Sequence, residues 1–209
     1  MVTEESFTID AFQALNLLSK HEDIDPSRIA ITGYSKGAIA AYYASWHYFQ
    51  NRLARNGAKF AAHLPVYAWC NVQEDTVNLT GAPMLFLSGG KDSQTPAKPC
   101  ARFVERAKAA NVDASIIIYP NARHSFDDPA SPPGGDSKAW NGAACMYAVD
   151  YAHGKGFRPN FEEPWRDWKL WDPFWKGCFK RGSEWGYNKA AAAQAHIDAK
   201  AFLQRVLGK

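Results

Sequence analysis

Hydrophobic side chains recur along the chain with two different periods. Ile9, Phe12, Leu15 and Leu18 are spaced by three residues, which predicts a helix from Ile9 to Lys20 with Thr8 as its N-cap. Short apolar runs, partly β-branched, predict buried parallel strands at 28–33, 60–69, 83–89 and 115–119. Further helical patterns lie at 37–55, 99–110 and 188–207, the last with Asn188 as its cap. Strands that alternate with helices predict an α/β fold with a parallel sheet of about four strands.

The alternation stops between residues 128 and 186. This stretch opens with Pro and Gly and holds six of the eight tryptophans, from Trp140 to Trp185. We expect a single domain over residues 1–209, with 128–186 as an aromatic-rich insertion of short irregular elements. Its tryptophans are expected either to form a small aromatic core or to offer a surface that binds sugars or a partner protein.

Composition narrows the classes of function. The net charge of +3 is mild and no run of basic residues occurs, so no nucleic-acid partner is expected. No stretch is apolar enough to cross a membrane, and the polar start at Met1 is unlike a signal peptide. Five histidines lack metal-ligand spacing, so neither a metal nor a cofactor is expected: His21, His47, His63, His153 and His196. The cysteines Cys70, Cys100, Cys145 and Cys178 fit either two disulfides or four buried thiols.

The segment Gly33-Tyr34-Ser35-Lys36-Gly37 follows a predicted strand and opens a predicted helix. A G-x-S-x-G sequence in that position is typical of a sharp turn that exposes a nucleophilic serine. Both glycines are expected where a Cβ would clash between strand and helix. The backbone N–H of Lys36 is the expected oxyanion donor.

A catalytic serine needs a base, and the base needs an orienting acid. Asp92 follows the third predicted strand, and His124 follows the fourth, which is the chain order Ser–acid–His of such folds. Glu74, Asp75 and Asp127 are weaker candidates for the acid. Tyr34 and Arg123, next to the serine and the histidine in the chain, are candidate substrate-binding residues.

The sequence resembles the dienelactone hydrolase family of the α/β-hydrolase superfamily. The resemblance runs through 24–30, the serine turn, 81–87 leading to Asp92, Thr95-Pro96, and 119–127. It implies Ser35 as nucleophile, Asp92 as acid and His124 as base.

Three features depart from that family. The name-giving enzymes carry a cysteine where this chain has Ser35, which favours a general esterase. The insertion is longer than the usual link between the histidine and the last helix. Only one helix precedes the serine strand, so we expect a C-terminal portion of an α/β-hydrolase, lacking the first strands and the second oxyanion donor. A signal sequence ahead of Met1 would change the localisation from cytoplasmic to secreted or periplasmic.

The leading hypothesis is a serine hydrolase of a carboxylic ester or lactone, acting through an acyl-enzyme on a small-molecule substrate. A serine peptidase would use the same residues. The alternative is a weak or inert module that binds or assembles through its Trp-rich insertion. Two further expectations concern neighbours in space: Cys70 and Cys100 lie close together, and the open edge of the 28–33 strand promotes homo-oligomers.

Overall fold

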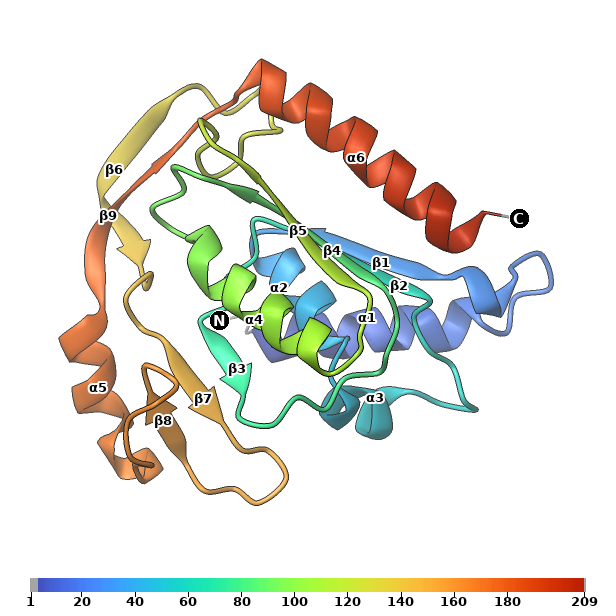
Figure 1. Ribbon diagram of the computed structural model, residues 1–209, viewed down its shortest axis with the longest axis horizontal. Coiled ribbons are helices and arrows are strands. Elements are labelled where there is room, and N and C mark those ends of the chain that lie inside the picture. Colours follow the sequence, from blue (N-terminus) through green and yellow to red (C-terminus); the bar gives the residue numbers. More distant parts are fainter. Residues whose placement is uncertain (1–3, 209) are drawn as a thin grey trace.

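Four parallel strands form the central sheet of the protein, in the order β1-β2-β4-β5 (Figure 1). The structure is a computed structural model that describes residues 4–208. The bounds of the four strands are Ala30–Tyr34 (β1), Ala62–Val66 (β2), Met84–Gly89 (β4) and Ala114–Tyr119 (β5). Each predicted strand is therefore present, and the α/β fold is confirmed.

The two faces of the sheet are covered unequally. Helices α1 (Glu4–Leu18), α2 (Lys36–Tyr43) and α4 (Ala97–Ala109) pack on one face, where Phe12, Tyr42 and Phe103 belong to one core. The other face carries α6 (Lys189–Leu207), whose Phe202 packs in a second core with Leu64 and Leu87. The strand order follows the chain in one direction, so right-handed crossovers place α2 and α4 on the same side.

Two helix predictions are corrected by the structure. The first helix begins at Glu4, and Thr8 is buried within it rather than capping it. The pattern at 37–55 is divided into α2 and a separate helix, α3 (His47–Leu53). Trp46 separates them with extended backbone, because it forms a bridge with Leu79 and is fully buried there.

The insertion is more regular than its sequence predicts. Strand β6 pairs antiparallel with β9, while β7 pairs with β8 and also with β3, a strand that the sequence did not predict. Helix α5 lies beside them at the left of Figure 1. Their bounds are Val72–Glu74 (β3), Gly134–Asn141 (β6), Tyr147–Val149 (β7), Phe157–Pro159 (β8), Trp171–Cys178 (α5) and Lys180–Trp185 (β9), with short 3₁₀ turns at Pro26–Arg28 and Trp168–Leu170.

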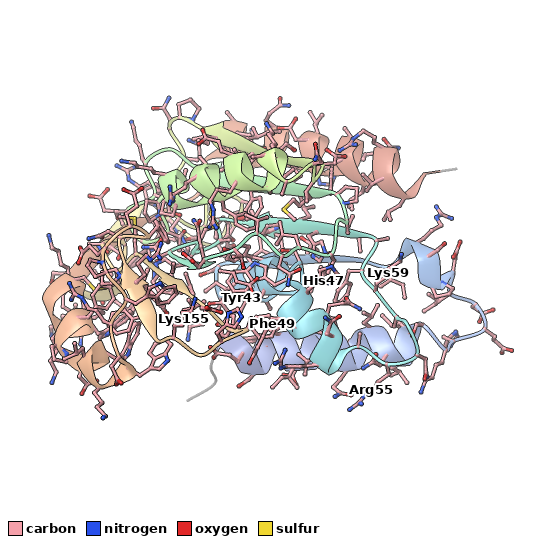
Figure 2. All side chains as sticks on the ribbon, turned by 60° about the horizontal axis from the view of Figure 1, so that its bottom comes forward. Tyr43, His47, Phe49, Arg55, Lys59 and Lys155 are labelled. Atoms are coloured by element: carbon pink, nitrogen blue, oxygen red, sulfur yellow. A yellow bond between two sulfur atoms is a disulfide. The ribbon has the colours of Figure 1, made fainter. Side chains whose placement is uncertain are left out.

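Aromatic rings hold the insertion to the rest of the chain. Within it, Trp171 and Trp175 stack with ring centroids 5.5 Å apart. Tyr151 stacks on Tyr48 of α3 at 4.2 Å and meets Phe49 edge-on. The rings of Tyr43 and Phe49, both labelled in Figure 2, are stacked with their centroids 5.2 Å apart. Trp140 and Trp168 of the insertion are nevertheless 37% and 48% exposed, so the aromatic-core and binding-surface interpretations both stay predictions.

Two disulfides join the cysteines, Cys70–Cys100 and Cys145–Cys178, with Cα separations of 5.0 and 5.1 Å. The expected proximity of Cys70 and Cys100 is confirmed. The first bond connects the segment after β2 to the start of α4, and the second connects the segment before β7 to the end of α5. Both are fully compatible with the Cα distances that a disulfide requires.

The outer edge of β1 is the end of the central sheet, and the insertion lies elsewhere. We therefore still expect the protein to associate in solution, because an open strand edge offers backbone N–H and C=O groups for pairing. Light scattering across a dilution series should show an apparent mass that falls on dilution. A concentration-independent monomer would contradict this expectation.

Within residues 4–208, none of the helices has the length and apolarity to cross a membrane.

Candidate active site

Ser35 occupies the turn between β1 and α2. Its backbone has φ 52° and ψ −116°, a conformation that L-residues rarely adopt. The Ser35 N–H donates to the Val66 carbonyl at 3.1 Å, which ties the turn to the end of the neighbouring strand. The strained turn thereby places the Ser35 side chain at the carboxyl end of the sheet.

The two glycines of the motif have different roles. A Cβ on Gly33 would lie 2.1 Å from the carbonyl oxygen of Gly37, so only glycine fits at this crossing of strand and helix. A Cβ on Gly37 would meet no heavy atom within 4 Å. The expectation that both glycines prevent a clash is therefore right for Gly33 and wrong for Gly37, which faces open space at the start of α2.

Asp92 and His124 lie in the loops that follow β4 and β5, and both are buried, with exposed fractions of 5% and 6%. His124 Nε2 is 3.0 Å from Ser35 Oγ, and His124 Nδ1 is 2.9 Å from Asp92 Oδ2. The structure thus brings the three predicted residues into one chain of hydrogen bonds. With the proton on Nδ1, His124 donates to Asp92 and accepts from the Ser35 hydroxyl.

Thr95 contacts the Asp92 carboxylate, and the sequence analysis did not predict this contact. Its hydroxyl lies 2.7 Å from Asp92 Oδ2 and 3.1 Å from His124 Nδ1. The N–H groups of Gln94 and Thr95 both donate to Asp92 Oδ1 at 2.8 Å. The carboxylate is therefore held in one orientation. A threonine three residues after a loop aspartate is the local sequence signal that could have predicted the hydrogen bond between Thr95 and Asp92.

Tyr67 lies behind the histidine, and its backbone also has a positive φ, of 41°. Its ring meets the His124 ring edge-on, with centroids 4.8 Å apart, and its hydroxyl donates to Asp127 Oδ1 at 2.9 Å. Burial, and then the negative charge of Asp127, raise the pKa of Tyr67. Tyr67 therefore stays protonated and keeps this bond. Asp127 is bound to Tyr67 rather than to the histidine, so the geometry favours Asp92 as the orienting acid.

The insertion reaches this site through its last strand. Trp185 bridges to His124, and the Gly186 N–H donates to the His124 carbonyl at 2.9 Å. Arg123, a candidate substrate-binding residue, donates from Nε to the Glu184 carboxylate at 2.9 Å. It is therefore engaged in an exposed ion pair. Strand β9 consequently fixes the backbone of the histidine loop.

Lys36 is the first residue of α2 and its side chain is exposed. The amide at this position is one of those that find no acceptor within a helix, so it is available to an oxyanion. We expect Lys36→Ala to react with p-nitrophenyl acetate at a rate within about tenfold of wild type, because the backbone N–H remains. A loss as large as that of Ser35→Ala, in the same steady-state assay, would contradict this role.

Glu74 lies away from the site, at the end of β3, and pairs with Val149 of β7. Its side chain is buried, with 7% of the residue exposed, and Oε2 has no hydrogen-bond partner. Burial first, and then the charge of Asp150, raise the pKa of Glu74 to about 7. The positive charge of Arg106 lowers the pKa of Glu74 and so opposes this shift. Arg106 makes its hydrogen bonds to the Gln73 side chain and to the backbone carbonyls of Glu74 and Asp75.

A pH dependence of stability follows from Glu74. Because the folded protein holds this proton more tightly than the unfolded chain, the free energy of unfolding should fall as pH rises from about 4.5 to about 7 and level off above. The slope is at most about 1.4 kcal/mol per pH unit. Denaturant unfolding of Glu74→Gln should lack this fall. Parallel pH profiles for wild type and variant would contradict the prediction.

Of the five other histidines, all of them among the described residues, only His63 is buried. His63 is buried beneath α2, where its Nδ1 is 3.0 Å from the Ala41 carbonyl, and burial lowers its pKa to about 4. In the described part of the chain, no three His, Cys, Asp or Glu side chains gather into a metal-ligand set.

Comparison with known proteins identifies the family. The model of the dienelactone hydrolase family matches residues 2–149, which is more than half of the chain. The chain belongs to the dienelactone hydrolase family. Its relatives include a Yersinia pestis protein named carboxymethylenebutenolidase, 29% identical over 170 residues that cover 78% of this chain and 60% of that protein. A Salmonella typhimurium protein of the same name is 27% identical over 121 residues, which cover 56% and 44% of the two chains.

The chain thus spans less than two thirds of the length of these relatives. Among solved structures, esterase 2 of Thermogutta terrifontis superposes with a TM-score of 0.50 at 17% identity, over 60% of this chain and 56% of that chain. A likeness at this level of identity concerns the fold, which is that of an α/β-hydrolase. The family resemblance is confirmed, and so is the α/β-hydrolase fold.

Proposed function

We propose that this member of the dienelactone hydrolase family hydrolyses a carboxylic ester or lactone through an acyl-enzyme on Ser35. The observation that carries the proposal is the chain of hydrogen bonds from Ser35 Oγ through His124 to Asp92, with distances of 3.0 and 2.9 Å. A serine hydroxyl is a weak nucleophile by itself, and an adjacent oriented imidazole is what activates it.

In the proposed mechanism, Ser35 Oγ attacks the substrate carbonyl while His124 Nε2 takes the hydroxyl proton. Asp92 stabilises the imidazolium, and the Lys36 N–H donates to the oxyanion. His124 then gives the proton to the leaving alcohol or ring oxygen, and a water molecule releases the acid by the same steps in reverse. Tyr34 lies beside the serine as a substrate contact, and Arg123 would contact substrate only by leaving Glu184.

Covalent labelling tests the nucleophile directly. Paraoxon should transfer its diethylphosphoryl group to Ser35 Oγ and release p-nitrophenol, and peptide mass spectrometry should place one adduct on Ser35. Ser35→Ala should remain unlabelled. The p-nitrophenyl acetate assay should show turnover by the wild type alone. An unlabelled wild type, or an adduct that persists in Ser35→Ala, would refute the proposal and favour an inert module.

A further inference from the structure

Tyr67 follows β2 directly, in a backbone conformation that few residues with a side chain adopt. Its φ is 41°, in the left-handed region. Such a conformation persists only where surrounding contacts hold it. Here the Tyr67 N–H donates to the Leu87 carbonyl of β4 at 2.7 Å, and Thr95 Oγ1 lies 3.0 Å from the Tyr67 carbonyl oxygen. The backbone of Tyr67 is therefore bound to the strand and the loop that carry Asp92.

The side chain of Tyr67 reaches the other two segments of the proposed triad. Its hydroxyl donates at 2.9 Å to Asp127, which lies three residues after His124 in the same loop. Its ring contacts the His124 ring and lies 5.9 Å from the ring of Tyr34, the residue before Ser35. One residue thus contacts the loop of the acid, the loop of the base and the turn of the nucleophile.

The hydrogen bonds of His124 leave one motion of its ring weakly restrained. Nδ1 contacts Asp92 and Nε2 contacts Ser35, and the two bonds lie close to one axis through the imidazole. A tilt of the ring about that axis changes both bond lengths little, so a contact with the ring itself is needed to fix its plane. The Tyr67 ring supplies one, with the centroids 4.8 Å apart and 63° between the ring planes.

A second tyrosine in the same core makes the same kind of bond elsewhere. Tyr119 ends β5, and its hydroxyl donates to Asp198 of α6 at 2.8 Å. Both tyrosines are buried, and both rings contact Phe126, at 5.2 Å for Tyr119 and 5.5 Å for Tyr67. The carboxylate that Tyr119 holds belongs to the last helix, whereas the one that Tyr67 holds belongs to the histidine loop. Tyr119 is therefore a matched control for Tyr67.

We propose that Tyr67 is a positioning residue: tied to Asp127 by its hydroxyl, its ring holds the His124 imidazole in the plane from which Nε2 takes the Ser35 proton. The inference rests on the proposed function, because it takes His124 as the base. Without the hydroxyl, the ring remains but is no longer bound to the histidine loop. Because a displacement of about 1 Å can cost on the order of a hundredfold in rate, Tyr67→Phe should lower kcat about tenfold to a hundredfold and change KM by less than about threefold.

The first test compares Tyr67→Phe with Tyr119→Phe in p-nitrophenyl acetate hydrolysis and in urea unfolding. Each variant removes one hydroxyl from a partly exposed carboxylate that water can then solvate, so both should fold and lose similar stability. Only Tyr67→Phe should lower kcat. A role that is merely structural would affect the two variants alike.

The second test is a double-mutant cycle. Asp127→Ala should lower kcat by about the same factor as Tyr67→Phe, and the double variant should lose no more than either, because both changes break one bond. Asp127→Asn keeps a side-chain oxygen as acceptor and should retain most of the activity. The Cε1–H proton resonance of His124, assigned by its absence in His124→Ala, responds to the ring current of Tyr67. It should move in Tyr67→Phe and in Asp127→Ala, and stay in place in Tyr119→Phe.

The outcomes separate this inference from the proposed function. Unchanged kcat in Tyr67→Phe, equal losses of kcat in Tyr67→Phe and Tyr119→Phe, or a loss confined to KM would overturn the positioning role and leave the acyl-enzyme proposal intact. If the wild type turns over no ester, the proposed function fails and the His124 resonance decides. Movement in both Tyr67→Phe and Asp127→Ala, without movement in Tyr119→Phe, supports the hold of Tyr67 on the ring, and any other pattern overturns it.

Discussion

Replacing Ser35 with alanine is expected to lower kcat for p-nitrophenyl acetate by several orders of magnitude, on the order of 10⁴ to 10⁶. The hydroxyl is the atom that forms the acyl bond in the proposed mechanism, and no neighbouring group in the hydrogen-bonded chain can replace it. His124→Ala should cost a similar factor, because without the imidazole the hydroxyl keeps its proton.

The double variant provides the sharper version of this test. If Ser35 and His124 act as one unit, removing both should cost about as much as removing either one, rather than the product of the two losses. Steady-state kinetics with purified wild type, both single variants and the double variant would measure this. Multiplicative losses, or a Ser35→Ala variant that retains most of its activity, would refute the catalytic unit. Circular dichroism of each variant serves as the control that the variant is folded.

Replacing Gly33 with alanine is expected to destabilise the fold by about 3 kcal/mol or more. The new methyl group would lie 2.1 Å from the Gly37 carbonyl oxygen and 2.8 Å from the Ala38 nitrogen. Both are backbone atoms at the start of α2, so relief requires the helix to move away from β1. That movement would also displace Ser35 from His124, and activity should fall more than stability alone predicts.

Gly37→Ala is the matched control for this prediction. The same methyl group at Gly37 meets open space, and alanine favours helix, so stability should stay unchanged or rise by up to about 1 kcal/mol. Urea unfolding of both variants measures the difference. Equal stabilities for the two variants would show that the strand–helix crossing tolerates a Cβ, contrary to the geometry.

The candidate site was predictable because its signals are local. The serine turn is defined by five consecutive residues between a strand and a helix, and Asp92 and His124 each follow an apolar run directly. Carboxyl ends of parallel strands meet at one edge of a sheet, so the order of the elements brought the three residues together without knowledge of their contacts. The roles of Tyr34, Lys36 and Arg123 stay predictions.

Other features of the site had no local signal. The contacts of Thr95 and of Tyr67 with His124 depend on how three separate loops pack. The division of 37–55 into two helices likewise depends on Leu79, which lies far along the chain from Trp46. Periodicity describes one face of one helix and carries no information about such partners.

The sequence by itself determined the α/β architecture, the position of the serine turn and the chain order of the acid and the histidine. Each of these follows from apolar runs and turn residues that act over a few positions. Only the tertiary structure decided the pairing of β6 with β9, the Cys145–Cys178 disulfide, and the bond between Gly186 and the histidine loop. The strand pairing and this disulfide join residues that lie some thirty to fifty positions apart. Their partners are chosen by the packing of the aromatic insertion, which no short window of sequence specifies.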